Sequence, residues 1–177
     1  TAAIDVALVN GTPFLNVSTG GLGAEATEEA PVEVKRLLGP LAYFVTGVKK
    51  FVALNPSHAR FTDGGGSSLY DGPFLIFAVG NCRRTGGGNR LTPRADPGDG
   101  LLDVCVVGEM PRRDLLTLLP DLRAGRHLEH PAVVYRQVRE LRVESEEELS
   151  VNVDGEPIGG RILSYTLSPH RIELSLP

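Results

Sequence analysis

Two aspartates in a short segment rich in glycine and proline have the spacing of a cation-binding loop. Asp96 and Asp99 lie three residues apart with Pro97 and Gly98 between them, so the backbone bends tightly there. Such a bend can direct two carboxylates and a main-chain carbonyl at one point, and hard divalent cations prefer that set of oxygen ligands. The ligand ladder of an EF-hand is missing. A surface turn, in which these residues serve only the backbone, is the alternative.

A second pair of acids follows a segment of alternating polarity. Asp154-Gly155 comes after Val151-Asn152-Val153 and predicts a hairpin turn, and Glu156 follows directly. A carboxylate at a strand end can act as a general base if it lies within hydrogen-bonding reach of the proton that it removes. The sequence does not separate Asp154 from Glu156 in this role. A solvated turn without catalytic function is the alternative.

Two further features could serve an anionic or polar site. Residues 80–88 form a glycine-rich segment with Arg83 and Arg84, and such loops can hold phosphate through backbone amides and charge. The Gly-Lys-Ser/Thr signature of nucleotide-binding phosphate loops is absent from this segment. Asp5 stands inside an apolar run, where it lies either on a solvated face of a sheet or in a polar site.

The segments that carry these residues are mostly strands. Asn10-Gly11 and residues 63–66 predict hairpin turns between them. Apolar runs bounded by turn signals predict strands at 4–9, 14–17, 74–79, 101–107, 133–138, 140–143, 149–153, 162–167 and 171–176.

Helices and loops complete the pattern. Helices are predicted at 31–38, 40–53 and 111–124. Residues 18–24 are expected to form a glycine-rich loop, and the acidic run 144–148 a solvated hairpin tip. The sum predicts an α+β, mostly β chain: a β-sandwich with two or three added helices, forming a single domain over 1–177.

Composition limits the classes of function. A net charge of −4 argues against a broad nucleic-acid surface, which needs a clustered basic face. No apolar run approaches the roughly 18 residues of a membrane-spanning helix. Cys82 and Cys105 each lie in an apolar run, so we expect two reduced strand thiols and a cytoplasmic protein.

Four segments together resemble the diacylglycerol kinase / YegS-type lipid kinase family, and they occur in the family's order. The resemblance covers nearly the whole chain and is most specific between Gly86 and Asp103. The four segments are NGTPFLNVSTGGLGAE, LLGPLAYFVTGVKKF, AVGNCRRTGGGNRLTPRADPGDGLLDVCVV and VNVDGEPIGG.

The resemblance implies one half of a two-domain kinase. In the family an N-terminal α/β domain binds ATP with a GGDGT motif, the C-terminal domain is a β-sandwich with added helices, and the active site lies in the cleft between them. This chain matches the C-terminal domain and contains no GGDGT. The ATP-binding domain is therefore expected outside this chain, and the isolated chain is expected to be inactive.

The resemblance also implies roles for single residues. Asp96, Asp99 and the Leu101 carbonyl are the expected ligands of a structural magnesium. Some members of the family have an apolar residue at the position of Asp96 and bind the ion through its carbonyl. Asp154 or Glu156 is expected to be the proton acceptor. The strand acid Asp5 is expected to belong to a polar network near the catalytic magnesium.

The implied reaction is transfer of the ATP γ-phosphoryl group to a lipid hydroxyl, with Mg²⁺ as cofactor, in phospholipid biosynthesis. Peripheral contact at the inner face of the membrane is expected, and pairing of exposed sandwich edges would allow a homodimer. One alternative is half of an NAD-kinase-like enzyme that acts on a soluble substrate. Another is a non-catalytic β-sandwich that binds lipid or mediates dimerisation.

Overall fold

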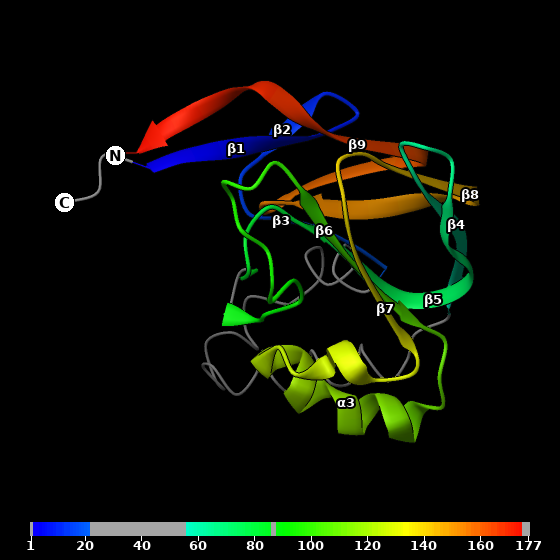
Figure 1. The fold of residues 1–177 in the computed structure, drawn as a ribbon. Coiled ribbons are helices and arrows are strands. Elements are labelled where there is room, and N and C mark those ends of the chain that lie inside the picture. The colour runs from blue at the N-terminus through cyan, green and yellow to red at the C-terminus, as the bar shows by residue number, and fades with distance from the viewer. Residues whose placement is uncertain (1, 22–55, 86–87, 175–177) are drawn as a thin grey trace, which may run out of the picture.

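The computed structural model describes residues 2–21, 56–85 and 88–174 (Figure 1). The helices predicted at 31–38 and 40–53 lie outside these ranges. Within the ranges, no helix combines the length and the apolarity needed to cross a bilayer. The strands are β1 Ala2–Val9, β2 Thr12–Phe14, β3 Val17–Gly21, β4 Ser57–Asp63, β5 Ser68–Gly80, β6 Leu102–Gly108, β7 Val133–Val138, β8 Leu141–Val153 and β9 Glu156–Leu174. One α-helix, α3 Arg112–Ala124, and a 3-10 turn, His127–Glu129, complete the described elements.

Antiparallel pairing joins the strands in the order β2-β1-β9-β8-β3-β5-β6-β7. The long strands β5 and β8 each pair with β4 at one end and with β3 at the other. β3, β5, β4 and β8 therefore close a ring, which folds the sheet into a β-sandwich. β1 and the C-terminal part of β9 extend from it as a long ribbon (Figure 1).

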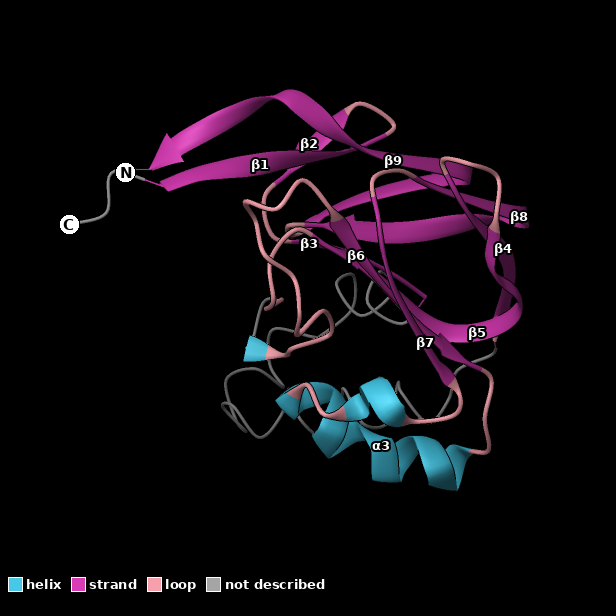
Figure 2. Ribbon diagram, in the orientation of Figure 1, coloured by secondary structure: helices cyan, strands magenta, loops and turns pink. Residues whose placement is uncertain are grey.

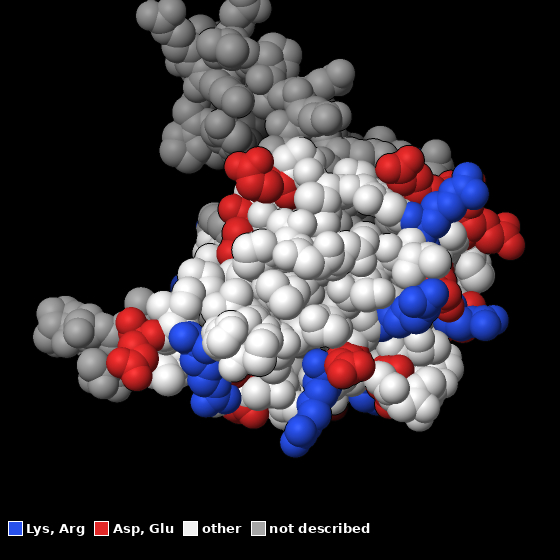
Figure 3. Space-filling view, turned by 90° about the horizontal axis from the view of Figure 1, so that it is seen from above, with Lys and Arg blue, Asp and Glu red and all other residues white. Residues whose placement is uncertain are grey.

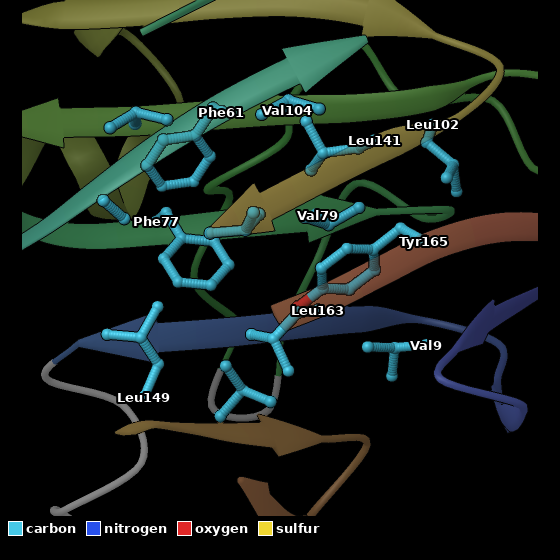
Figure 4. Packing of buried hydrophobic residues seen from close by; sticks show 14 of the residues in the cluster. Val9, Phe61, Phe77, Val79, Leu102, Val104, Leu141, Leu149, Leu163 and Tyr165 are labelled. Atoms are coloured by element: carbon cyan, nitrogen blue, oxygen red, sulfur yellow. The ribbon is translucent and has the colours of Figure 1, made fainter. Parts of the chain in front are cut away.

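The interior of the sandwich is filled by aromatic and aliphatic side chains from both layers (Figure 4). Phe61, Phe74 and Phe77 pack edge to face with ring centroids 5.2–5.6 Å apart. Each such pair adds about 0.5–1.5 kcal/mol beyond the burial of its area. Tyr165 is fully buried beside them, and its hydroxyl is 3.0 Å from Ser18 Oγ, so its polar atom is satisfied.

A second, smaller core lies between the sheet and α3 (Figure 2). Leu115, Leu118 and Leu122 recur at three- and four-residue steps and form the buried face of the helix. Gly125 ends the helix in the left-handed conformation with φ +77°. This helix covers the face on which the long loop between β5 and β6 folds back.

The β1–β9 ribbon gives the molecule one face that is largely uncharged. Seen from above, this face has uncharged side chains over its middle, with arginine and acidic side chains gathered toward its margin (Figure 3).

The predicted fold class is confirmed, with one α-helix present in the described part of the chain. The strand predicted at 133–138 has the bounds of β7, and the helix predicted at 111–124 differs from α3 by one residue. Asn10 and Gly11 have φ +48° and +84°, which is the turn predicted between β1 and β2.

The glycine-rich loop predicted at 18–24 is wrong for residues 18–21, which belong to β3. A Cβ at Gly20 would lie 2.1 Å from the Phe77 ring, so the glycine permits close packing inside a strand. Residues 22–24 lie outside the described ranges.

Three strand predictions also differ from the structure. The strand predicted at 14–17 is interrupted, because β2 ends at Phe14, β3 begins at Val17 and residues 15–16 form a bend between them. The acidic run 144–148 is exposed as expected, but it lies inside β8, where a register shift between Glu144 and Leu149 absorbs the extra residues. Residues 162–167 and 171–174 belong to one strand, β9. Pro169 is tolerated there because β9 bulges between Leu167 and Arg171, so the proline has no partner in β1.

Candidate active site

The turn between β8 and β9 holds one of the two candidate bases in a fixed position. Asp154 and Gly155 have φ +49° and +110°, and Val153 pairs with Glu156 across the turn, as predicted for a hairpin. The Asp154 carboxylate accepts hydrogen bonds from three consecutive backbone N–H groups. They come from Leu15 at 2.7 Å, Asn16 at 3.0 Å and Val17 at 3.1 Å.

The other candidate base differs sharply from its neighbour. Glu156 begins β9 and is exposed, and its carboxylate has no hydrogen bond or ion pair to any described residue. A carboxylate with free lone pairs can accept a proton from a bound hydroxyl, whereas one that already accepts several N–H bonds has fewer lone pairs to offer to a substrate. The structure thus separates two acids that the sequence leaves equivalent.

A buried asparagine links this turn to the N-terminal strand. Asn81 is fully buried at the end of β5, and its Nδ2 donates to the carbonyls of Leu15, at 3.0 Å, and Asp5, at 2.8 Å. Only glycine fits before it, because a Cβ at Gly80 would lie 2.2 Å from Thr92 Oγ1. Asn81 therefore connects the loop that caps Asp154 with β1.

Asp5 is buried, so the solvated-face alternative is excluded. Its carboxylate contacts Arg171 Nε at 2.7 Å and accepts the Gly100 N–H at 2.9 Å. Its own N–H donates to the Pro97 carbonyl at 2.6 Å. Asp5 thus ties the loop before β6 to the ribbon formed by β1 and β9.

The loop that carries the predicted magnesium ligands is ordered by two local turns. Asp96 Oδ1 accepts the Gly98 N–H at 3.1 Å, and Asp99 Oδ1 accepts the Leu101 N–H at 2.9 Å. Each carboxylate keeps its second oxygen free of hydrogen bonds within the described part of the chain. Two such oxygens and a carbonyl fit a hard cation in donor type. In the described ranges no three acidic, histidine or cysteine side chains gather into a metal cluster.

Cys82 marks the place where the two acidic loops approach each other. Burial raises the pKa of its thiol, and the negative charges of Asp154 and then Asp96 raise that pKa further. Its Sγ lies 3.2 Å from the Leu15 carbonyl. Asp154 and Asp96, which sequence analysis placed in separate constellations, therefore both lie near Cys82, two residues after the end of β5.

A pocket opens beside this point. It has a volume of about 470 Å³ and is lined by residues of β3, of the 84–85 segment and of the β8–β9 turn, Asp154 included. Arg84, from the glycine-rich segment singled out in the sequence, contributes to its wall. The structure thus places that segment next to the Asp154 turn.

Sequence reasoning missed Arg171 and the role of Asn81. Arg171 is the antiparallel partner of Asp5 in the β1–β9 register. In the sequence Arg171 is one charged residue of a predicted strand, and no local pattern indicates that it pairs with Asp5. Asn81 lies within a segment that the family resemblance includes, but nothing in its type predicts two backbone partners.

Residues 16–176 match the model of the YegS C-terminal NAD kinase beta sandwich-like domain. The chain belongs to this family. It is 37% identical over 174 residues to the "Probable lipid kinase YegS-like" protein of Pseudomonas aeruginosa (strain UCBPP-PA14), covering 98% of this chain and 56% of the relative. The protein of the same name from Stenotrophomonas maltophilia (strain K279a) is 35% identical over 163 residues, covering 92% and 52%. The chain therefore spans little more than half the length of these relatives.

Solved structures share the fold of the family. A diacylglycerol kinase from Bacillus anthracis str. Sterne superposes with a TM-score of 0.64 at 18% identity, covering 94% of this chain and 50% of that one. Another chain from the same organism superposes with a TM-score of 0.71 at 24% identity, covering 94% and 55%. The identification as a C-terminal lipid-kinase-family domain made from the sequence is confirmed.

Proposed function

We propose that this chain is the C-terminal domain of a kinase that transfers the γ-phosphoryl group of ATP to a lipid hydroxyl, such as that of diacylglycerol. The relatives that it matches over almost its whole length are named as lipid kinases. Because the chain covers little more than half of them, the same proposal assigns the ATP site to an N-terminal domain of the intact enzyme.

The observation that carries the proposal is that the carboxylates of the two acids at the β8–β9 turn have different surroundings. Three backbone N–H groups occupy the Asp154 carboxylate, while that of Glu156 is exposed and unpaired among the described residues. We assign Glu156 as the general base and Asp154 as the residue that holds the 15–17 segment in place.

Phosphoryl transfer depends on position and charge more than on covalent help from the protein. Glu156 accepts the proton of the lipid hydroxyl as that oxygen bonds to the γ-phosphorus. The bond from phosphorus to the bridging oxygen breaks, and ADP leaves with the electron pair. Asp154 keeps the Leu15–Val17 backbone beside the reacting groups.

Magnesium, when bound, neutralises charge on the phosphate oxygens of such a reaction. Asp96, Asp99 and the Leu101 carbonyl would hold a separate, structural ion. A lipid acceptor also implies that the enzyme works at a membrane surface, at its cytoplasmic face.

The base assignment is tested by Glu156→Gln and Asp154→Asn in the intact enzyme. We expect Glu156→Gln to lower kcat by about 10²–10⁴-fold, the usual contribution of a general base, and to leave the melting temperature unchanged. Asp154→Asn should instead lower the free energy of unfolding by about 1–3 kcal/mol, because an amide group replaces an acceptor that faces backbone N–H donors. ATP-dependent lipid phosphorylation and thermal melts measure the two effects. Near-normal turnover in Glu156→Gln would contradict the assignment.

A further inference from the structure

The pocket beside the β8–β9 turn offers several hydrogen-bond donors that are not paired with acceptors in residues 2–21, 56–85 and 88–174. Arg84 lines it and makes no hydrogen bond or ion pair with any described residue. Thr19 and Asn152 are directly opposite each other on β3 and β8, so both side chains point to the same side of the sheet. The Asn152 Oδ1 accepts the Gly155 N–H at 2.9 Å, which leaves its Nδ2 group as a donor.

The carboxylate that lines the pocket, in contrast to these donors, already has hydrogen-bond partners in the protein. Asp154 is the acidic residue among those that line it, and its oxygens are turned to the N–H groups of residues 15–17. The carboxylate is therefore already hydrogen-bonded, whereas the Arg84 guanidinium, the Thr19 hydroxyl and the Asn152 amide are not paired with described acceptors. A ligand with acceptor oxygens would match these donors.

We propose that this pocket binds a phosphate group, with Arg84 as its principal contact. A phosphate offers several acceptor oxygens and a negative charge, and the planar guanidinium fork of arginine matches two of those oxygens at once. The Thr19 hydroxyl and the Asn152 amide donate to the remaining oxygens from the strand side. The inference rests on the proposed function only for the molecule that carries the phosphate, which is either the nucleotide or the phosphorylated lipid.

The pocket also adjoins the turn that carries the two acids of the proposed active site. Asp154 lines it, and Glu156 is the second residue after Asp154. A phosphate held by Arg84 therefore lies beside the β8–β9 turn that carries both acids. Arg84 acts here as a binding residue that fixes the substrate, separate from the proton transfer at Glu156.

The ¹⁵N-labelled chain titrated with inorganic phosphate, at ionic strength held constant with chloride, tests the proposal. We expect saturable shifts of the Thr19, Asn152 and Gly155 amides. Arg84→Gln should raise the Kd by about tenfold or more, the equivalent of one lost charge-assisted contact. Arg90→Gln is the matched control, because Arg90 is an exposed arginine of the same long loop outside the pocket lining, and it should leave the Kd unchanged.

A second variant guards against loss of the fold. Thr19→Val removes one donor while keeping the side-chain shape, and a well-dispersed spectrum with weaker phosphate binding would support the site. The absence of saturable shifts, or an equal Kd for Arg84→Gln and the unaltered chain, would overturn the proposal.

Binding of two ligands, ATP and a short-chain phosphatidic acid, is then compared to identify which molecule supplies the phosphate. Stronger Arg84-dependent binding of the phosphatidic acid assigns the pocket to the lipid headgroup, and stronger binding of ATP assigns it to the nucleotide. Arg84-dependent binding of neither ligand overturns the site as a substrate subsite. These measurements do not depend on turnover. If the intact enzyme binds phosphate through Arg84 but phosphorylates no lipid, the kinase proposal is rejected and the phosphate site is retained.

Discussion

At the scale of single residues, acids of the same type serve different purposes because their surroundings differ. Asp154 and Asp5 are both held by hydrogen bonds, whereas Glu156 is exposed to solvent. A carboxylate that positions backbone segments cannot at the same time offer its lone pairs to a substrate. The candidate base is therefore the acid with the fewest contacts.

Asp5→Asn removes the charge of a buried carboxylate but keeps its shape. We expect the free energy of unfolding to fall by about 1–3 kcal/mol, because the Arg171 ion pair is lost while Arg171 remains half-exposed and can be solvated. Urea denaturation of the chain measures the loss. The control is Asp71→Asn, which breaks the Arg60–Asp71 pair of similar geometry at the surface and should cost about 0.5 kcal/mol or less. Equal losses in the two variants would contradict the role assigned to Asp5.

At the scale of elements, the segment between β5 and β6 is held by contacts within itself and by contacts with the sheet. Thr92 Oγ1 donates to the Cys82 carbonyl inside the segment at 2.7 Å, and the Arg94 N–H donates to the hydroxyl of Tyr135, in β7, at 3.2 Å. The Gly100 N–H donates to Asp5, as described above. These contacts fix the loop to the sheet, and a bound cation would add to them.

The predicted cation site can be tested through the stability of this loop. If Mg²⁺ binds Asp96, Asp99 and the Leu101 carbonyl, a hundredfold excess over its Kd stabilises the chain by about 2.7 kcal/mol and raises the melting temperature by roughly 5–10 °C. Chelator-treated chain is the reference. Asp99→Ala should abolish the difference, while Asp71→Ala, at an exposed site elsewhere, should retain it. Identical melting curves with Mg²⁺ and with chelator would contradict the site.

At the scale of the whole molecule, one buried acid should influence the pH dependence of stability. Asp103 is fully buried in β6, where Tyr135 donates to it at 2.5 Å and Gln137 at 3.2 Å. Burial raises the pKa of Asp103 above its ordinary value of 3.8, and these hydrogen bonds only partly oppose the shift. A raised pKa means that the folded chain binds this proton more tightly than the unfolded chain does.

The sign of the effect follows from this difference. The stability that Asp103 contributes is fully present below its unfolded pKa and is lost as the pH rises through the raised folded pKa. Relative to Asp103→Asn, the unaltered chain should therefore lose stability as the pH rises from about 4 to 7. Urea denaturation of both proteins across that range measures the difference, in which groups common to both cancel. A pH-independent difference would contradict the prediction.

Local patterns predicted most of the fold because turns and strand periodicity depend on neighbouring residues. The Asn10-Gly11 and Asp154-Gly155 turns and the bounds of β7 are of this kind. The continuity of β8 and β9 could not be predicted in the same way, since bulges at 144–149 and 167–171 interrupt the alternation. The site was only partly predictable for a related reason. Asp5 and Arg171 meet through strand register, and the amides that bind Asp154 come from a segment near the other end of the chain.

The bond between the Leu15 N–H and Asp154 joins residues 139 positions apart. β3 reaches β8 across a similar separation, so almost the entire polypeptide has to be in place before the acids of the hairpin acquire their final surroundings. Chains dominated by such long-range pairings assemble slowly, since the entropy of closing a large loop is lost before its contacts form. The arrangement of residues 15–17 around Asp154 is therefore a late product of folding, and no short fragment of the sandwich can reproduce it.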